Sequence, residues 1–273
     1  MSKHTCSGGW VTPCCVLIAL GAMLIASPAA GDDTAALALD DFFPLVTRRP
    51  VLERELGVRV SNAKRRDGQE TTIAPALAMP IVLWWQLTLE MPVVFTNPRL
   101  GDGAGGAGDL ELESKFLVFQ STDSRTQLST GFSLTLPTGS ERRDLGGQLA
   151  IEPFVSAGTM RGRAYLVAEI AYGWSLNDGG PHPKDQTLTA GVAAGYAVRP
   201  WLIPLLELTT VTRVGGVPQP GDRDRRGQPQ LYISPGVNVQ LLREVTLGIG
   251  FQLPVTNARF FDYALHGTLD WSF

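Results

Sequence analysis

The sequence predicts an all-β protein, a closed antiparallel transmembrane β-barrel of about 12 strands behind an N-terminal signal peptide. Three observations predict this fold. Apolar and polar residues alternate with period two over runs of eleven or more residues, which indicates long strands. The connections between the runs alternate between long and short, as they do in outer-membrane barrels. Aromatic residues gather near the ends of the runs, where such barrels carry interfacial girdles.

Composition narrows the possible functions. Hydrophobic residues make up 44% of the 273 positions, so the chain is not disordered. The net charge of −3 argues against a nucleic-acid partner. All three cysteines lie in the first fifteen residues, so the chain beyond them has no disulfide, thiolate metal site or cysteine nucleophile.

The first element, residues 1–30, is typical of a secretory signal peptide. Lys3 and His4 precede an apolar run at 14–26, and small residues follow at 27–31. A run of thirteen apolar residues is too short for a membrane-spanning helix, which needs about 20. We therefore expect a cleaved leader that delivers the chain across the inner membrane to the outer membrane, with an N-terminal anchor as the alternative.

Residues 31–50 form the second element, a periplasmic N-terminal segment or a plug of the lumen. It carries an apolar patch that includes Phe42 and Phe43, with Asp40 and Asp41 within it and Arg48 and Arg49 after it. Such a patch could fill the lumen as a gate, or the segment could remain a tail in the periplasm. Both interpretations stay open on the sequence alone.

Residues 51–273 form the third element, the barrel. The predicted strands cover 52–62, 71–81, 84–96, 109–120, 126–137, 148–159, 163–176, 187–198, 201–214, 229–241, 244–256 and 260–273. Twelve strands place both ends of the barrel in the periplasm. The connection at 257–259 is the one exception to the alternation, being short where a long one is expected.

The alternation leaves two ways to fold. In Val245–Thr256 one face is Val, Leu, Ile, Phe, Leu and Val, and the other is Thr, Gly, Gly, Gln, Pro and Thr. A membrane barrel turns the apolar face to lipid, whereas a soluble periplasmic β-protein buries it. The length of the strands and the scarcity of Lys on the polar faces favour the barrel. The expected girdle residues are Trp84, Trp85, Phe95, Tyr172, Trp174, Trp201, Phe260, Phe261, Trp271 and Phe273.

Prolines within the predicted strands argue against a regular ladder. Pro75, Pro153 and Pro235 lie well inside strands, and a closed barrel has no edge strand to hold them. We expect β-bulges to accommodate these prolines, at positions that the sequence does not fix.

The parity of the strands predicts which ionisable side chains line the lumen. They are Glu53, Glu55, Arg59, Glu90, Glu111, Glu113, Lys115, Glu152, Glu169, Glu207, Arg213, Asp262, His266 and Asp270. An acidic excess would favour cations or neutral solutes. Alternatively these groups pair with one another and fill the interior. Glu111, Glu113 and Lys115 share one face of one strand and form a candidate ion-pair cluster.

Catalysis and metal binding have little support. The histidines are His4, His182 and His266, and along an extended strand His266 stands roughly 13 Å from Asp262 and Asp270. A catalytic dyad requires a direct hydrogen bond between the histidine and the acid, and this separation excludes one within the strand. Partners on neighbouring strands remain open. We predict no catalytic residue, no metal site and no cofactor.

Two short motifs carry a family resemblance. Residues 105–116 read GGAGDLELESKF, and residues 134–139 read LTLPTG. Gly106, Gly108, Asp109, Leu110, Leu112, Lys115 and Phe116 in the first, and Leu136, Pro137, Thr138 and Gly139 in the second, resemble a family of outer-membrane transporters named for the meta pathway of phenol degradation. Glu113 departs from the small residue usual there. The alternate residues Tyr263, Leu265, Leu269, Trp271 and Phe273 resemble the C-terminal membrane-insertion signal of outer-membrane barrels.

The resemblance implies a channel or facilitated transporter for small, hydrophobic or aromatic solutes. Its implied partners are outer-membrane lipid, the outer-membrane assembly machinery and a small-molecule solute. Basic residues in the long connections, such as Lys64, Arg65 and Arg66, add lipopolysaccharide to the expected partners. A non-conducting structural or surface-binding barrel and a membrane enzyme are the alternatives.

Overall fold

The structure is a computed structural model that describes residues 37–123, 125–140, 145–177, 185–216 and 227–273. The predicted signal peptide with its cysteines lies outside the described residues, as do His182, Arg142, Arg143, Arg223, Arg225 and Arg226. The described residues belong to one compact unit, Thr34–Phe273. None of them forms a helix long and apolar enough to cross a membrane.

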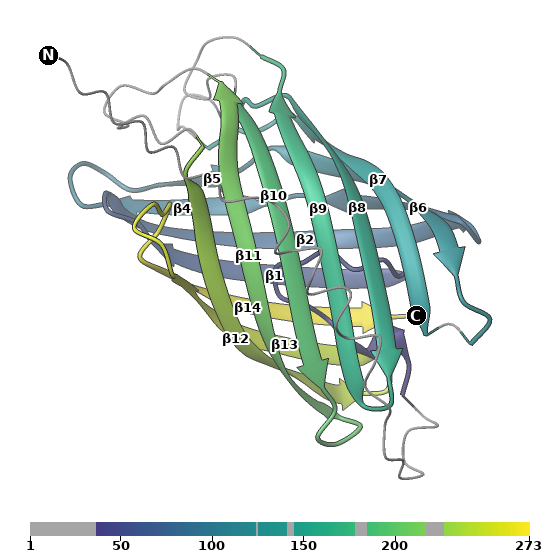
Figure 1. Cartoon of the computed structure of the whole chain (residues 1–273). Coiled ribbons are helices and arrows are strands. Elements are labelled where there is room, and N and C mark those ends of the chain that lie inside the picture. The colour runs from purple at the N-terminus through teal and green to yellow at the C-terminus, as the bar shows by residue number, and fades with distance from the viewer. Residues whose placement is uncertain (1–36, 124, 141–144, 178–184, 217–226) are drawn as a thin grey trace, which may run out of the picture. The chain divides into compact units, whose positions relative to one another are not determined.

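The wall is built from antiparallel strands that lie side by side around the barrel (Figure 1). In the described residues they are β1 (Glu55–Lys64), β2 (Gly68–Val82), β3 (Trp85–Glu90), β4 (Val93–Pro98), β5 (Ala104–Ala107), β6 (Leu110–Gln120), β7 (Thr126–Leu136), β8 (Ala150–Arg161), β9 (Ala164–Ser175), β10 (Asp185–Tyr196), β11 (Leu202–Gly216), β12 (Pro229–Leu242), β13 (Val245–Pro254) and β14 (Tyr263–Ser272). β3 and β4 are two parts of one wall strand, as are β5 and β6. The predicted barrel of twelve strands is thus confirmed.

The barrel closes because β1 pairs with strands on both sides. Val58 lies opposite Leu269 of β14 and opposite Pro75 of β2. The other strands pair with their neighbours in the chain, and β2 pairs with both β3 and β4. With no free edge, every wall strand has partners on two sides, which removes the exposed strand edge that promotes aggregation.

The connections also alternate, with two differences from the prediction. The β13–β14 connection covers residues 255–262, so the expected exception at 257–259 is wrong. The β1–β2 connection is shorter than predicted and covers only residues 65–67. Both strands continue beyond the residues in which apolar and polar side chains alternate. Backbone pairing continues there between polar residues, such as Asn62 and Thr71.

Pro75, Pro153 and Pro235 interrupt pairing without adding a residue, so the expected bulges do not lie at these three positions. Pro75 lies opposite the gap between β3 and β4, where β2 pairs up to Ile73 with one segment and from Ala76 with the other. At Pro153 and Pro235 the register continues while pairing with one neighbour lapses. A proline has no backbone N–H to donate to a neighbouring strand. Each of these prolines therefore lies where pairing with one neighbour is interrupted.

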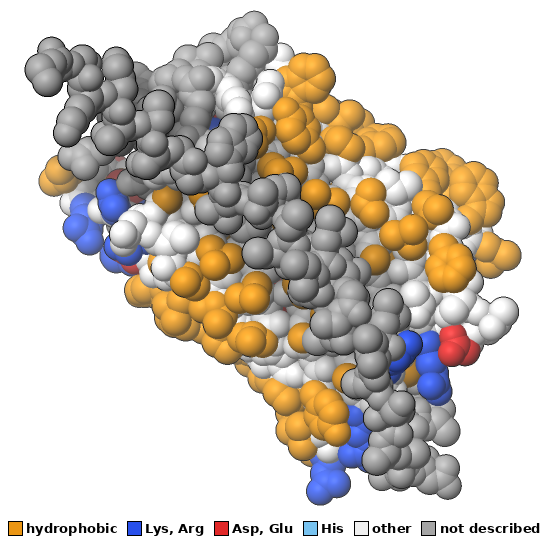
Figure 2. Space-filling view, in the orientation of Figure 1, with side chains coloured by type: hydrophobic (Ala, Val, Ile, Leu, Met, Phe, Trp, Pro, Cys, Tyr) orange, Lys and Arg blue, Asp and Glu red, His pale blue; other side chains and the backbone are white. Residues whose placement is uncertain are grey.

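The two faces of the strands are arranged as predicted for a membrane barrel. In β13, Thr246, Gly248 and Gln252 point inward and are buried, whereas Ile249 and Leu253 are exposed. On the face shown in Figure 2, hydrophobic side chains spread over the strands, and Lys and Arg gather towards strand ends. An exposed apolar wall around a polar interior is typical of β-barrels that span a lipid bilayer.

Most of the expected girdle residues are exposed on the outer face. They are Trp84, Phe95, Tyr172, Trp174, Trp201, Phe260, Trp271 and Phe273. Trp85 is half-buried, and its indole N–H donates to the hydroxyl of Ser114 at 2.9 Å. Phe261 stacks on buried Tyr232 at 4.7 Å between ring centroids, so it does not belong to a girdle.

Candidate functional site

The N-terminal segment 37–54 lies against the inner wall of the barrel. It contains a short 3₁₀ turn, Leu39–Asp41, bends at residues 45–47 and continues without regular structure to β1. Its buried apolar side chains include Leu37, Leu39, Phe42, Leu45 and Val51, which pack on the inner-wall residues Met160, Tyr165, Val167, Ala193, Ala197, Ile203 and Leu205. Phe42 stacks on Tyr165 with 5.3 Å between ring centroids. This is the main apolar cluster of the interior, and it holds the segment by burial of apolar surface.

Small residues on the wall make room for this packing. A Cβ on Gly158 would lie 2.9 Å from Cγ of Pro50, and one on Gly236 would lie 2.6 Å from Cδ1 of Leu45. Real Cβ atoms do not come this close to other carbons, so the segment needs glycine at these points. The glycines of the polar strand faces therefore shape a groove for residues 37–54.

Glu207 binds the middle of the segment. Its side chain is fully buried, yet its carboxylate accepts hydrogen bonds from backbone N–H groups of Val46 at 3.2 Å and Thr47 at 2.9 Å. The hydroxyl of Thr47 donates to the same carboxylate at 2.9 Å, and the N–H of Leu45 donates as well. These donors replace the water that a buried carboxylate loses.

Other wall side chains bind the backbone of the segment on both sides of this point. Asn238 accepts from the N–H of Phe43 at 3.1 Å. The hydroxyl of Ser156 donates to the carbonyl oxygen of Arg48 at 2.6 Å, and the hydroxyl of Ser129 donates to that of Pro50. Lys115 donates to the carbonyl oxygen of Arg49 at 3.3 Å, and Gln86 accepts from the N–H of Glu53 at 2.9 Å. The wall thus recognises the segment largely through its main chain.

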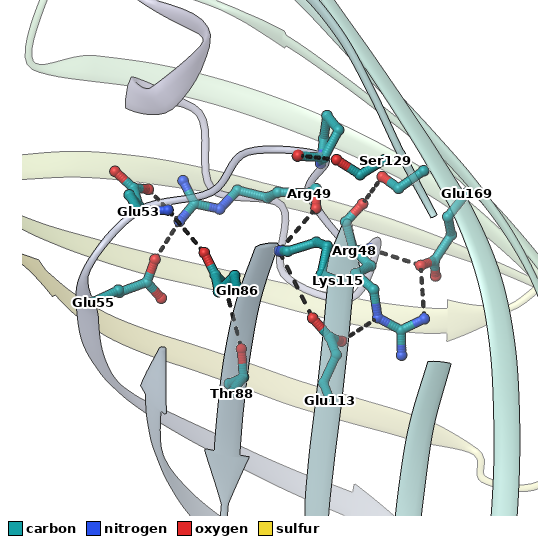
Figure 3. A network of polar contacts seen from close by, with 12 residues as sticks. Arg48, Arg49, Glu53, Glu55, Gln86, Thr88, Glu113, Lys115, Ser129 and Glu169 are labelled. Atoms are coloured by element: carbon teal, nitrogen blue, oxygen red, sulfur yellow. Dashed lines mark hydrogen bonds and ion pairs between the residues drawn. The ribbon is translucent and has the colours of Figure 1, made fainter. Parts of the chain in front are cut away.

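Arg48 lies among three carboxylates of different strands. Its Nε is 2.8 Å from Glu113 and its Nη2 is 3.1 Å from Glu152, while Nη1 is 3.7 Å from Glu169. The guanidinium also lies over the ring of Phe154, 4.1 Å from the ring centroid. Figure 3 shows Arg48 reaching from the segment to Glu113 and Glu169. Each of the three guanidinium nitrogens faces one carboxylate, which suits its planar fork of donors.

The side chain of Arg49 points the other way, towards Glu53 and Glu55 (Figure 3). Its Nη2 lies 2.6 Å from Glu53 and also bonds Glu55. The guanidinium stacks over the ring of Phe43 at 3.9 Å. The two consecutive arginines contact different carboxylates, so this pair ties the segment to two groups of acids.

The predicted lumen residues fall into separate groups, and Asp262 lies in the β13–β14 connection rather than in a strand. Arg59 pairs with Glu90 at 3.4 Å. Lys115 lies 3.7 Å from Glu113 within the predicted cluster, whereas Glu111 forms no ion pair with a described residue. Arg213 pairs with Asp185 at 2.9 Å, and Asp262 pairs with Arg259 at 2.9 Å in a connection. Glu152, Glu169 and Glu207 bind the segment as described above.

Sequence reasoning missed Arg48 and Arg49 as the partners of these acids. The signal was present, because two arginines follow an apolar patch and the predicted lumen carries an acidic excess. The partners of Arg48 come from β6, β8 and β9, however, and no local pattern links positions so far apart.

Within the described ranges, His266 forms its hydrogen bond with an amide and not with an acid. Its Nε2 lies 3.0 Å from the amide oxygen of Gln252, whose Nε2 donates to Thr209 at 3.1 Å. Among the described residues, no group of three or more His, Cys, Asp or Glu side chains is arranged to hold a metal ion.

Two cavities lie in the interior, and the segment lines one of them. One has a volume of about 150 Å³ and is lined by Arg48 and Arg49 together with acids such as Glu53 and Glu90. The other has a volume of about 260 Å³ and opens among the β7–β10 ends that carry the long connections, between Glu111, Ser133, Glu152 and Asp185. Glu111 is the one residue that lines both cavities, so the two spaces adjoin at its side chain. This arrangement can bind small solutes and, if the segment moves, pass them.

Comparison with known proteins agrees with this geometry. A family model described as "Putative MetA-pathway of phenol degradation" matches residues 57–265. No curated protein matches the sequence. Among solved structures, the fold is similar to an outer membrane channel from Pseudomonas putida F1, with a TM-score of 0.63, 16% identity, and coverage of 90% of this chain and all of that one.

Two porins are also similar in fold. The NanC porin matches with a TM-score of 0.54 and 11% identity over 80% of this chain and 98% of its own. The KdgM porin matches with a TM-score of 0.51 and 11% identity over 80% of this chain and 99% of its own. The fold is therefore that of outer-membrane β-barrels.

Proposed function

The chain belongs to the family described as "Putative MetA-pathway of phenol degradation", and from this premise we propose that it is an outer-membrane channel or facilitated transporter for small solutes. The observation that carries the proposal is the closed barrel with an apolar outer wall and a polar, charged interior that contains cavities. The family description points to small aromatic or other hydrophobic compounds as the solutes. Reconstituted protein should conduct ions in planar bilayers and admit phenol-sized solutes into vesicles.

Residues 37–54 are proposed to plug this channel. Support comes from the buried apolar side chains of the segment and from its backbone hydrogen bonds to Glu207, Asn238 and Ser156. A tail that remained in the periplasm would not pack on glycines of the wall or form hydrogen bonds with its polar side chains. Deletion of residues 32–49 should raise single-channel current, and an unchanged current would contradict the plug.

A non-conducting barrel is the second candidate. It is favoured by one observation, that the segment and its ion pairs occupy much of the interior and leave cavities of only about 150 and 260 Å³. Absence of both current and solute entry, for the wild type and for the deletion of 32–49, would support this candidate over a channel.

Location and partners complete the proposal. A cleaved signal peptide at 1–30 would export the chain, and the exposed residues Tyr263, Leu265, Leu269, Trp271 and Phe273 would serve as the signal to the assembly machinery. Lipid would contact the apolar outer wall, and lipopolysaccharide would contact basic residues such as Arg66 near the long connections. We propose no enzymatic role, since His266 bonds an amide rather than an acid. Heat-modifiable gel migration of a detergent extract tests the location and barrel state together.

A further inference from the structure

The N-terminal segment leaves one side of the barrel interior open. Residues 37–54 pack on the wall that runs from β8 to β12, where Tyr165, Leu205 and Gly236 are among their neighbours. The smaller cavity, of about 150 Å³, lies between the segment and the opposite wall, which is formed mainly by β1, β2, β3 and β6. The segment therefore occupies one side of the interior, and open space remains along the other.

The two cavities lie at different heights in the barrel. The smaller one reaches the end that carries the short turns, because it is lined by Glu55, the first residue of β1, and by Gln86, which follows the β2–β3 turn. The larger one, of about 260 Å³, is lined by Thr135 near the end of β7 and by Asp185 at the start of β10. Those two positions border long connections. Together the cavities therefore extend along much of the length of the barrel.

Glu111 marks the boundary between the two cavities. The strand register places Glu90 of β3 opposite Glu111 on one side and Thr135 of β7 opposite it on the other. Glu90 lines the smaller cavity, and Thr135 lines the larger one. Glu111 lines both. A solute that moves from one cavity to the other therefore passes the side chain of Glu111.

Glu111 brings a carboxylate to this boundary without a basic side chain at ion-pair distance among the described residues. The neighbouring cations pair with other acids: Arg59 lies 3.4 Å from Glu90, and Lys115 lies 3.7 Å from Glu113. A carboxylate that lines a passage attracts cations and repels anions, as the acidic rings of cation channels do. The charge of Glu111 therefore acts on any ion that crosses the boundary.

We propose that Glu111 is the charge-selecting residue of the channel: solutes pass its side chain between the two cavities, and its carboxylate favours cations and uncharged solutes over anions. This inference deepens the proposed channel function and rests on it. It narrows the solutes from small hydrophobic or aromatic compounds in general to those that carry no negative charge.

Reversal potentials across a bilayer in a KCl gradient measure this preference in the full-length protein. Glu111→Gln keeps the size of the side chain and removes its charge. We expect the permeability ratio of K⁺ to Cl⁻ to fall by about fivefold at low salt, the factor that corresponds to one charge about 4 Å away in water. Glu111→Asp keeps the charge and should keep the ratio. Glu244→Gln removes the same charge from an exposed turn and should behave like the wild type.

A thiol at this position allows the charge to be set after folding. The chain has no cysteine beyond residue 15, so Glu111→Cys adds the only thiol outside the leader, and wild type treated alike reports any effect of the leader. Two methanethiosulfonates attach either a sulfonate or a trimethylammonium group. The sulfonate should restore the preference for K⁺, and the trimethylammonium should shift it towards Cl⁻. Leu112→Cys is the matched control, because Leu112 lies opposite exposed Leu89 on the outer face and should respond to neither reagent.

The outcomes separate this inference from the channel function. Current with a permeability ratio that neither Glu111→Gln nor the two reagents change leaves the channel standing and overturns the role of Glu111. No current from the wild type or from the deletion of 32–49 contradicts the channel and, with it, the passage at Glu111. If only the deletion conducts, the same changes in that background should shift the ratio in the same direction, because Glu111 belongs to the wall.

The reagents also cover a failure to fold. If Glu111→Gln gives no heat-modifiable barrel, Glu111→Cys replaces it, since its charge is added to the folded protein. Equal permeability ratios after the sulfonate and the trimethylammonium reagent overturn the proposal in that case.

Discussion

The Asp109 carboxylate accepts a hydrogen bond from the backbone N–H of Gly139, with 2.9 Å between Oδ1 and N. The two residues belong to the two motifs that carry the family resemblance. The same carboxylate accepts from the N–H groups of Gly147 and Gln148, each at 2.8 Å. The first motif therefore holds both described ends of the β7–β8 connection that the second motif opens.

Loss of this carboxylate should loosen the barrel where β5 and β6 meet. Asp109→Ala leaves three backbone N–H groups without their charged acceptor, and we expect a loss of about 1–3 kcal/mol of stability. The midpoint of thermal unfolding in detergent, followed by heat-modifiable migration, measures it. Asp102→Ala, in an exposed position of the preceding connection, is the control. Equal midpoints for the two variants would show that the carboxylate does not hold the connection.

The sequence predicts the wall well because period two follows from strand geometry alone. Each predicted strand appears, and the inward residues Thr246 and Gln252 follow from parity. The position of the interior segment was harder to predict, because residues 37–54 have no regular period and their partners lie on strands that are distant in the sequence. The hydrogen bond from the backbone N–H of Thr47 to Glu207, for example, joins residues 160 positions apart in the sequence.

Exceptions to the predicted pattern have local causes as well. Bulges were expected to accommodate prolines such as Pro153, but the register continues across it. The register of a strand depends on how both neighbouring strands pair with it, and the sequence of one strand does not show this. Phe261 was assigned to a girdle from its position near a strand end. It instead stacks on Tyr232, because the chain turns inward before β14 begins.

Glu207→Gln should release the middle of the segment. The glutamine amide places an N–H group where the backbone N–H groups of Leu45, Val46 and Thr47 need an acceptor. We expect docking to weaken by about 1–3 kcal/mol and single-channel open probability to rise. Glu244→Gln, in an exposed turn, should behave like the wild type. If Glu207→Gln and Glu244→Gln give the same currents, Glu207 does not latch the segment.

Gly195 and Phe42 should depend on each other. A Cβ on Gly195 would press into the Phe42 ring, so Gly195→Ala should destabilise the protein. In a Phe42→Ala background the same change should cost little, giving a coupling of about 0.5–3 kcal/mol in a double-mutant cycle of urea unfolding. Gly267→Ala is the matched control, since the nearest atom to its added Cβ is 4.0 Å away. Additive effects of the first two changes would argue against close packing of Phe42 on the wall.

Asp41, at the end of the 3₁₀ turn, gives the segment a pH dependence. Burial raises the pKa of Asp41 above its ordinary value of 3.8, despite a hydrogen bond from the N–H of Ala38 at 2.7 Å. A carboxyl with a raised pKa holds its proton more tightly in the docked state than in the released state. Its docking is therefore strongest below 3.8 and weakens as the pH rises through the raised pKa.

Asp41→Asn removes this dependence while it keeps an oxygen to accept from Ala38. At about pH 7 we expect the variant to unfold at a higher temperature than the wild type, because it buries no charge. The difference should shrink as the pH falls and vanish at about pH 3, where Asp41 is protonated in both states. The charge of Asp41 also raises the pKa of Asp40, so Asp40 is replaced by Asn in both proteins and the difference between the two midpoints isolates Asp41. A difference that stays constant over this range would mean that the carboxyl of Asp41 is not protonated on docking.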